Sequence, residues 1–268
     1  MYCLEFAGEA ADEPVAALEA ERAAASAVER VAPGVGTARG LRVDRAPTLA
    51  YTRRASELLA RTVADVGSAV AALEAASIDR AGSVAVRARN VRSTADASTA
   101  AAERELGSVL VDCGFAVDLD DPDHELRAVF AGDSCLLGWQ VAERAAAFGS
   151  RAPTDRPFFQ PGSMAPVDAR AYANLAGAAP GRTLLDPMCG TGGLPLEAGL
   201  VGADAVACDA QAKMADGARR NFRAYLAADA DAPSPDWHVA RGDATALPLP
   251  DDAVDGVEET VACSLRFP

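Results

Sequence analysis

Apolar and polar positions alternate regularly along the second half of the chain. Short apolar runs are followed by helix-like segments, which predicts strands at 183–188, 204–209, 237–243 and 253–257 and helices at 194–200 and 212–228. Glycines and prolines mark the ends of several of these segments. Such alternation of short apolar strands with helices predicts a parallel, doubly wound α/β sheet.

The first half of the chain carries a less regular pattern. Leu58, Leu59, Val63 and Val66 would share one face of a helix, so a helix is predicted at 53–66. The remaining predicted elements are strands at 2–6, 48–52, 82–91, 115–119, 125–132 and 134–143, helices at 12–31 and 93–114, and a loop at 31–40. This mixture predicts an α+β region with an antiparallel component.

A segment rich in Pro and Gly at 148–170 separates the two patterns. With 268 residues, half of them apolar, the chain is long enough to bury two cores. We therefore predict an N-terminal α+β segment at 1–47, an α+β domain at 48–146, a linker at 147–166 and the doubly wound sheet at 167–268.

The glycine-rich stretch after the strand at 183–188 is the strongest chemical signal. Asp186 is followed by "PMCGTGG" and then by a helix, an arrangement in which glycines and a helix N-terminus can approach a nucleotide-like ligand. Asp209, 23 residues later, and Asp243 end the next two predicted strands. An acid at the second strand end suits ribose hydroxyls, and one at the third could meet an adenine amine. The alternative is an ordinary strand–helix turn with capping acids.

Charge and cysteine content narrow the function classes. The net charge of −14 argues against nucleic acid, but Lys213 is the only lysine and acids abundantly outnumber arginines, as on a halophilic surface. The window 41–110 is nevertheless slightly basic. Six cysteines without a CxxC pair and two isolated histidines predict reduced thiols, no metal site and a cytoplasmic location. No apolar run is long enough to span a membrane, and we expect no signal peptide.

Several stretches resemble a known group of enzymes. "DPMCGTGGLPLEAGL" and "VACDAQAKMADGARRNF" resemble the cofactor turn and second strand of S-adenosylmethionine-dependent methyltransferases that modify exocyclic amines of nucleic-acid bases. "RPFFQPGSMAPVDARAYANLA" is similar to the segment before the sheet in the RNA-modifying branch, and "VDLDDPDHELRAVF" to a THUMP RNA-binding module. Residues from about 1 to 257 thus resemble the archaeal THUMP-containing tRNA guanine methyltransferases.

The resemblance implies a cofactor, a partner and site residues. The cofactor would be S-adenosylmethionine, and the substrate a guanosine amine in tRNA, with no DNA or membrane partner expected. The predicted cofactor-binding residues are Phe159, Pro161, Asp186, Cys189, Gly190, Thr191, Gly192, Gly193, Asp209, Asp243 and Ala244. The predicted RNA-binding residues, chosen by position and charge, are Arg53, Arg54, Arg87, Arg89 and Arg92. For any single arginine, a solvated side chain in a lysine-poor protein is the alternative.

The sequence departs from this family after Val257. Amino-methyltransferases of this group carry an Asp/Asn-Pro-Pro-Tyr motif after the fourth strand, whereas this chain continues "EETVACSLRFP" with Glu258 and Glu259 in the strand. No catalytic residue is therefore assigned. We expect a Rossmann-like sheet that is incomplete at its C-terminus, from a truncated or frame-shifted copy, with low solubility and no methyl transfer. A short RNA-binding protein with a vestigial second half, or a DNA or ribosomal-RNA amino-methyltransferase, are the alternatives.

Overall fold

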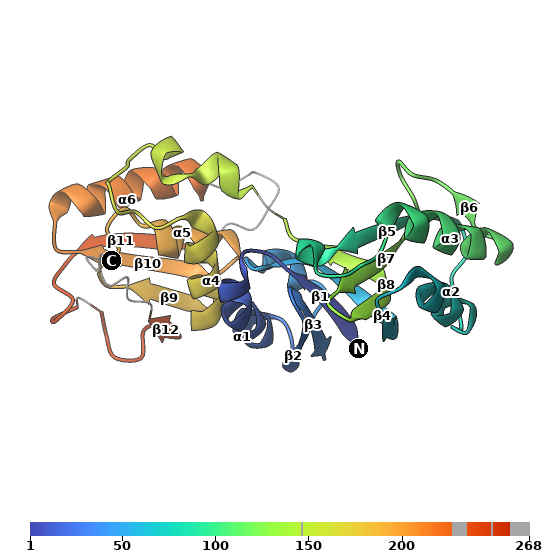
Figure 1. The fold of residues 1–268 in the computed structure, drawn as a ribbon. Helices are drawn as coiled ribbons and strands as arrows, with labels where there is room; N and C mark the ends of the chain where they lie inside the picture. The colour runs from blue at the N-terminus through green and yellow to red at the C-terminus, as the bar shows by residue number, and fades with distance from the viewer. Residues whose placement is uncertain (146, 227–234, 248, 258–268) are drawn as a thin grey trace. The chain divides into compact units, whose positions relative to one another are not determined.

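A computed structural model describes residues 1–145, 147–226, 235–247 and 249–257 (Figure 1). The chain forms two compact units. Unit 1 comprises residues 1–47 and 51–144, and unit 2 comprises residues 48–50 and 145–268. The predicted segment "EETVACSLRFP" lies outside the described residues.

Unit 1 is built on one eight-stranded sheet with the order β2-β3-β1-β4-β8-β7-β5-β6. Neighbouring strands are antiparallel except that β5 runs parallel to both β6 and β7. The strands are β1 (Tyr2–Phe6), β2 (Ala27–Ala32), β3 (Val35–Arg39), β4 (Thr52–Val63), β5 (Ser83–Asn90), β6 (Ala116–Val117), β7 (His124–Ala131) and β8 (Ser134–Glu143). The α+β region with an antiparallel component that the sequence predicts is thereby confirmed.

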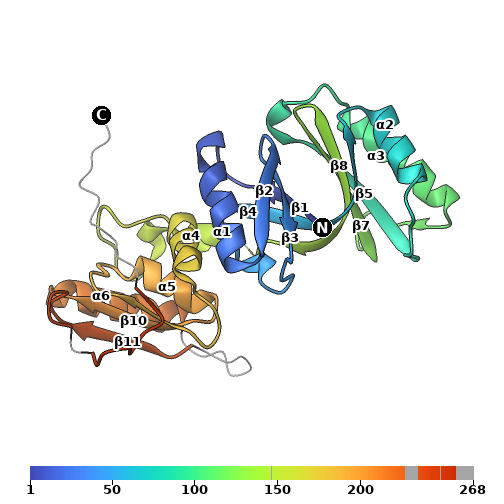
Figure 2. The same cartoon turned by 90° about the horizontal axis from the view of Figure 1, so that it is seen from below.

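Helices cover part of this sheet. Helices α2 (Val66–Glu74) and α3 (Thr99–Asp112) pack against each other and against β4 and β5, as Figure 2 shows. They enclose a core that includes Leu73, Leu106 and Phe130. Helix α1 (Glu13–Ala23) packs against β2. Short 3₁₀ helices occur at Ala10–Asp12, Ala46–Thr48 and Val91–Ser93 in the first part of the chain, and at Phe148–Arg151 and Pro153–Asp155 before α4.

The predicted helix at 53–66 is wrong, because Thr52–Val63 forms strand β4. This strand pairs with β1 on one side and β8 on the other, so its backbone groups are satisfied within the sheet. Leu58 packs against one core of the unit and Leu59 against the other. A strand with apolar neighbours on both faces does not alternate, which explains why its sequence looks helical. The helix begins later, at Val66, where the Asp65 carboxylate accepts a hydrogen bond from the Ser68 amide at 2.8 Å.

Three further predicted boundaries are wrong. The helix at 12–31 ends at Ala23, and 27–32 forms β2, since its backbone pairs with β3. The predicted loop at 31–40 is the other arm of this hairpin, closed at Pro33 and Gly34, where Gly34 has a φ of +70°. The strand at 48–52 is also wrong: the 3₁₀ helix ends at Thr48 and β4 starts at Thr52.

Unit 2 has a parallel four-stranded sheet with the order β11-β10-β9-β12. The strands are β9 (Thr183–Asp186), β10 (Asp204–Asp209), β11 (Trp237–Arg241) and β12 (Gly256–Val257), and the helices are α4 (Pro166–Ala176), α5 (Gly193–Leu200) and α6 (Ala212–Tyr225). Helix α5 packs against α4, α6 and the sheet (Figure 2). The predicted doubly wound arrangement is confirmed.

The strand order of unit 2 reverses at β9. From β9 the chain continues to β10 and β11 on one side and returns with β12 on the other. Asp255 fixes this return, because its carboxylate accepts a hydrogen bond from the Thr183 amide at 2.8 Å. In open α/β sheets, ligands bind beside such a reversal, at the carboxyl ends of the strands.

The predicted domain boundaries remain predictions. Residues 1–47 contribute three strands to the same sheet as residues 51–144, and α4 begins at Pro166. Among the described helices, none has the length and apolar character that crossing a membrane requires.

Candidate functional site

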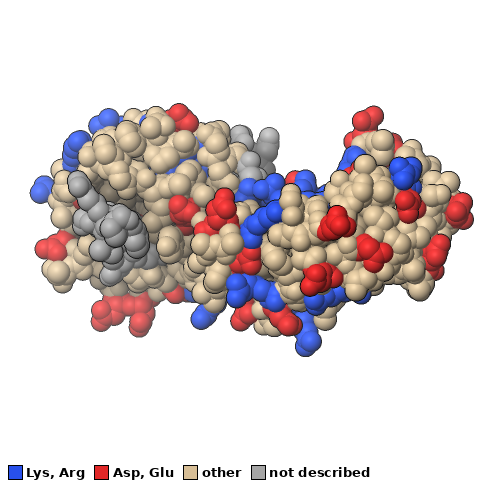
Figure 3. Space-filling model, in the orientation of Figure 1, with Lys and Arg blue, Asp and Glu red and all other residues tan. Residues whose placement is uncertain are grey.

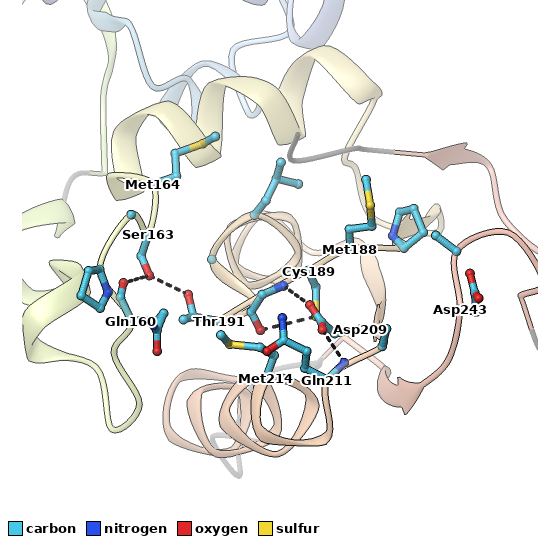
Figure 4. Close-up of a pocket in the computed structure, with 18 of the residues that line it drawn as sticks. Gln160, Ser163, Met164, Met188, Cys189, Thr191, Asp209, Gln211, Met214 and Asp243 are labelled. Carbon is cyan, nitrogen blue, oxygen red and sulfur yellow. Dashed lines mark hydrogen bonds between the residues drawn. The ribbon is translucent and has the colours of Figure 1, made fainter. Parts of the chain in front are cut away.

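A cavity of about 570 Å³ lies at the carboxyl ends of β9 and β10 in unit 2. Figure 4 shows that its wall combines the glycine-rich turn with the segment before α4 and the loops after β10 and β11. The lining residues are Gln160, Pro161, Gly162, Ser163, Met164, Pro187, Met188, Cys189, Gly190, Thr191, Gly193, Leu194, Asp209, Ala210, Gln211, Met214, Asp243, Ala244 and Thr245.

Three glycines shape the turn between β9 and α5, each for a different reason. Gly190 has a φ of +53°, and a Cβ there would meet nothing within 4 Å, because the residue faces the cavity. Gly192 has a φ of +74°, and a Cβ there would lie 2.8 Å from the Phe222 ring. At Gly193 a Cβ would lie 2.7 Å from Nη1 of Arg156. The turn therefore depends on glycine for conformation, for packing and for an open cavity.

Asp209 joins this turn to the loop after β10. Its carboxylate accepts hydrogen bonds from the amides of Gly190 at 2.9 Å and Gln211 at 2.8 Å. The residue is 9% exposed and lines the cavity. A carboxylate has about four acceptor positions, so Asp209 retains capacity for hydroxyl groups of a ligand.

The other two predicted acids occupy different surroundings. Asp186 is fully buried, accepts a hydrogen bond from the Met188 amide at 3.0 Å and does not line the cavity. Asp243 lines the cavity, and hydrogen bonds from the amide and hydroxyl of Thr245 lower the pKa of its carboxyl group. Asp186 therefore holds the turn through the Met188 amide, whereas the Asp243 carboxylate brings a negative charge to the cavity.

Cys189 and Cys208 lie beside these acids. Burial raises the pKa of the Cys189 thiol, and the charges of Asp186 and Asp209 raise it further. The pKa of Cys208 is raised by the same causes. A thiol with a raised pKa is a weak nucleophile at neutral pH, so the geometry supports a packing role for Cys189.

Asn221, which no sequence pattern indicates, connects the cavity wall to α6. Its side-chain oxygen accepts a hydrogen bond from the Phe158 amide at 2.9 Å, and its nitrogen donates to the carbonyls of Phe158 at 3.0 Å and Thr191 at 2.9 Å. The hydroxyls of Ser163 and Thr191 are 3.1 Å apart. These contacts hold the segment before α4 against the glycine turn.

Eight of the eleven predicted cofactor-binding residues line the cavity. Gly192, where a Cβ would meet Phe222, and the buried Asp186 do not line it. Phe159 does not line the cavity and is 43% exposed. Its neighbour Phe158 packs so closely on Gly217 of α6 that a Cβ there would overlap the ring, and Gln160 instead reaches the cavity.

The five predicted RNA-binding arginines lie in unit 1, and four of them contact acids. Arg54 pairs with Glu143 at 2.6 Å, Arg89 with Glu5 at 3.3 Å and Arg87 with Glu125 at 3.8 Å, while Arg92 pairs with Glu13. Arg53 is exposed. They do not form one patch of unpaired charge, because four of them pair with acids.

Arg144, which the sequence reasoning missed, lies close to Arg53. Its amide donates a hydrogen bond to the Arg53 carbonyl at 2.9 Å. Burial lowers the pKa of Arg144, and the charge of Arg53 lowers it further. Arg53 also contributes to the lowered pKa of Arg89, after the larger effect of burial. The charge of Arg53 thus acts on both Arg144 and Arg89.

The part of the chain that forms the cavity matches a known protein family. Residues 153–257 match the family model described as RMKL-like, methyltransferase domain. This part of the chain is similar to that methyltransferase family. The match covers the cavity wall, the glycine turn and all four strands of unit 2, and it agrees with the predicted cofactor, S-adenosylmethionine. Among the described residues, no group of three or more His, Cys, Asp or Glu side chains could hold a metal ion.

The similarity to known relatives extends over both units. The chain is 36% identical over 212 residues to the tRNA (guanine(10)-N2)-dimethyltransferase of Methanothermobacter thermautotrophicus, covering 78% of this chain and 60% of that protein. The enzyme of the same name from Methanocaldococcus jannaschii is 34% identical over 161 residues, covering 58% of this chain and 46% of that protein. The chain thus spans about half the length of these relatives, and the predicted resemblance to the archaeal tRNA guanine methyltransferases is confirmed.

A solved structure supports the fold. The crystal structure of TrmN from Thermus thermophilus has a TM-score of 0.51 and 26% sequence identity, covering 83% of this chain and 69% of that chain. The similarity confirms a mixed α/β architecture that ends in a Rossmann-like methyltransferase sheet.

Proposed function

We propose that this chain binds S-adenosylmethionine in unit 2 and serves the methylation of the exocyclic amine of a guanosine in tRNA. The observation that carries the proposal is the cavity at the strand-order reversal, where Asp209 holds the amide of Gly190. The archaeal relatives, which are tRNA (guanine(10)-N2)-dimethyltransferases, support guanosine in tRNA as the substrate.

The residues of the cavity fit the cofactor in size and chemistry. Its volume of about 570 Å³ lies in the range of small-ligand sites. Asp209 has acceptor capacity for ribose hydroxyls, and Asp243 can accept from an adenine amine. The cofactor supplies a methyl group on a positively charged sulfur. Met164, Met188 and Met214 give the cavity an apolar, polarizable lining suited to this group.

In this proposal, the described residues bind and orient the cofactor. None of them is assigned to binding the amine that accepts the methyl group. In the resembled family, the motif that orients the target amine follows the fourth strand. The corresponding position comes after Val257, outside the described residues. The role proposed for unit 2 is therefore to hold the methyl donor at the edge of the sheet.

Unit 1 is proposed to bind the tRNA, and Arg53 is the strongest candidate among the predicted arginines. It is exposed, and Arg89 and Arg144 lie near it. Figure 3 shows basic side chains gathered over the part of unit 1 that contains β1–β4, with acidic ones more frequent toward α2 and α3. A local positive surface can bind the phosphate backbone in spite of the net charge of −14. We propose a cytoplasmic location with no membrane or DNA partner.

Calorimetry with S-adenosylmethionine tests the cofactor assignment. We expect Asp209→Ala to weaken binding about tenfold or more, since it removes a charged hydrogen-bond acceptor from the site. Asp216→Ala is the matched control, because Asp216 is exposed on α6 and, within the described part of the chain, pairs only with Arg219. Equal affinity in Asp209→Ala and the native protein, or preferential binding of NAD or ATP, contradicts the proposal.

Filter binding of a tRNA transcript tests the partner. We expect the double variant Arg53→Ala and Arg144→Ala to bind more weakly and to show a shallower salt dependence, because phosphate contacts release counterions. Arg104→Ala is the control, since Arg104 is exposed on α3 and, among the residues that the structure describes, pairs only with its neighbour Glu105. Equal losses in the control and the double variant contradict the assignment to Arg53 and Arg144.

A further inference from the structure

A cluster of buried charges lies behind the glycine turn. Arg151, Arg156 and Arg170 are each less than a tenth exposed, and Glu197 of α5 is fully buried. The Glu197 carboxylate accepts hydrogen bonds from Nε and Nη2 of Arg151 at 2.9 and 3.1 Å and pairs with Arg170 at 2.7 Å. Glu197 thus pairs directly with Arg151 and Arg170, and the third arginine has other contacts.

Arg156 is this third arginine, and most of its donors are unused. Its Nε donates to the Arg151 carbonyl at 3.2 Å, but Nη1 and Nη2 are buried and have no hydrogen-bond partner among the described residues. Burial lowers its pKa, although Glu197 and Tyr225 oppose this effect. An arginine remains charged in a protein, so the site holds a buried positive charge with unmet hydrogen-bonding capacity. Burying such a charge lowers the stability of the fold unless another charge or hydrogen bond compensates for it.

The guanidinium of Arg156 lies directly behind the cavity wall. Nη1 is 2.7 Å, and Cζ 3.6 Å, from the position that a Cβ of Gly193 would occupy. Gly193 is the first residue of α5 and lines the cavity together with Leu194. The amides of both residues lack an acceptor within the helix, because they lie in its first turn. A full positive charge and the partial charge of the helix start therefore act on the same part of the cavity.

The cavity is polarised as a result. Asp209 and Asp243 bring negative charge to the part lined by the loops after β10 and β11 (Figure 4). Arg156 brings positive charge to the part lined by Gly193. A ligand with hydroxyls or an amine at one end and an anionic group at the other matches this arrangement. S-adenosylmethionine has both, since its nucleoside end carries the ribose and its amino-acid end carries a carboxylate next to an ammonium group.

We propose that Arg156 is a positioning residue that attracts the carboxylate of the cofactor's amino-acid part through the thin wall at Gly193. This inference rests on the proposed binding of S-adenosylmethionine. Because only a glycine allows the guanidinium to approach so closely, Arg156 and Gly193 act together. The attraction fixes which end of the cofactor enters that part of the cavity and so places the nucleoside beside Asp209.

Calorimetry with two ligands tests the inference on the full chain. S-adenosylhomocysteine carries the amino-acid part with its carboxylate, and 5′-methylthioadenosine lacks that part. We expect Arg156→Met to weaken S-adenosylhomocysteine about tenfold, the size of a charge interaction across a partly dry wall, and to leave 5′-methylthioadenosine unchanged. Arg223→Met, on the exposed side of α6, should change neither affinity.

The outcomes separate the inference from the function on which it rests. Equal losses for both ligands mean that Arg156 is only structural, and no loss for either also overturns the inference. If the native protein binds neither ligand, the proposed function itself fails. If Arg156→Met does not fold, as judged by circular dichroism, a measurement on the native protein tests the inference instead. Its affinity for the carboxyl methyl ester of S-adenosylhomocysteine should be about tenfold below that for S-adenosylhomocysteine, and equal affinities overturn the inference.

Discussion

Cys189 combines a position in the cavity wall with a low reactivity. Burial and the nearby carboxylates of Asp186 and Asp209 raise the pKa of its thiol, so the thiolate is scarce at neutral pH. We expect iodoacetamide at neutral pH to label the exposed Cys113 first and to reach Cys189 and Cys208 only on unfolding. Peptide mass spectrometry over time measures this order. Labelling of Cys189 at the rate of Cys113 would mean that the turn opens or that the thiol is activated.

Two glycines with positive φ allow the effects of backbone strain and of packing on stability to be separated. Gly192 and Gly181 have similar φ angles of +74° and +76°, but only Gly192 would place a Cβ against other atoms, at 2.8 Å from Phe222 and 3.0 Å from Ala218. We expect Gly181→Ala to lower the free energy of unfolding by about 1 kcal/mol through strain. Gly192→Ala should lower it by about 2–4 kcal/mol, because overpacking is added. Urea denaturation of both variants checks this, and equal losses would contradict the packing argument.

At the residue scale, the sequence located the part of the site that is continuous along the chain. The glycine turn and Asp209 are recognisable because their spacing is set by one strand–helix–strand unit. Asn221 and Arg156 could not be recognised, since their contacts join segments far apart in sequence: Asn221 reaches Phe158 across 63 residues. Such pairs depend on how helices pack on the sheet, and no local pattern reports that packing.

At the scale of elements, unit 2 was easier to predict than unit 1. Each strand of unit 2 is short and is followed by a turn or a helix, so the period of the sequence matches the structure. Strand β4 shows why unit 1 was harder. Leu58 and Leu59 are adjacent, yet each is covered by a different core, and the resulting apolar run has the spacing of a helix. Only the pairing partners β1 and β8 distinguish the two structures.

The buried pair of Glu5 and Arg127 tests whether β1 is an integral part of the larger sheet. Glu5 of β1 accepts hydrogen bonds from Nε and Nη2 of Arg127 on β7 at 3.0 and 3.2 Å, and both side chains are buried. We expect Glu5→Ala to lower the free energy of unfolding of unit 1 by about 3–5 kcal/mol, because it removes the buried carboxylate that pairs with Arg127 and Arg89 and leaves Arg127 to Glu125 at 3.2 Å. Glu57→Ala, which breaks an exposed pair with Arg80, should cost less than about 1 kcal/mol.

Denaturation followed by circular dichroism measures both variants. An effect of Glu5→Ala as small as that of Glu57→Ala would favour the predicted boundary at residue 47, with the first strands acting as a separate segment. A large effect would place β1 in the same cooperative unit as β7.

At the scale of the whole molecule, charge dominates. A chain with a net charge of −14 repels itself in the compact state, and dissolved salt screens that repulsion. We expect the unfolding temperature to rise as KCl increases from about 0.1 M to about 1 M, over which the screening length falls from about 10 Å to about 3 Å. Differential scanning calorimetry gives the measurement. An unfolding temperature that does not change with KCl would contradict the halophilic interpretation of the composition.

The position of β12 beside β9 has a consequence for how the protein is made. Leu184 of β9 is paired with Ala205 of β10 and with Gly256 of β12, so its second partner is synthesised 72 residues after it. At typical rates of synthesis, this delay is roughly 4–14 s. Throughout that time, one edge of the central strand offers unpaired backbone groups to other chains. Ribosome-bound chains halted before Gly256 should therefore be the ones that chaperones retain, and release should follow once Val257 has left the exit tunnel.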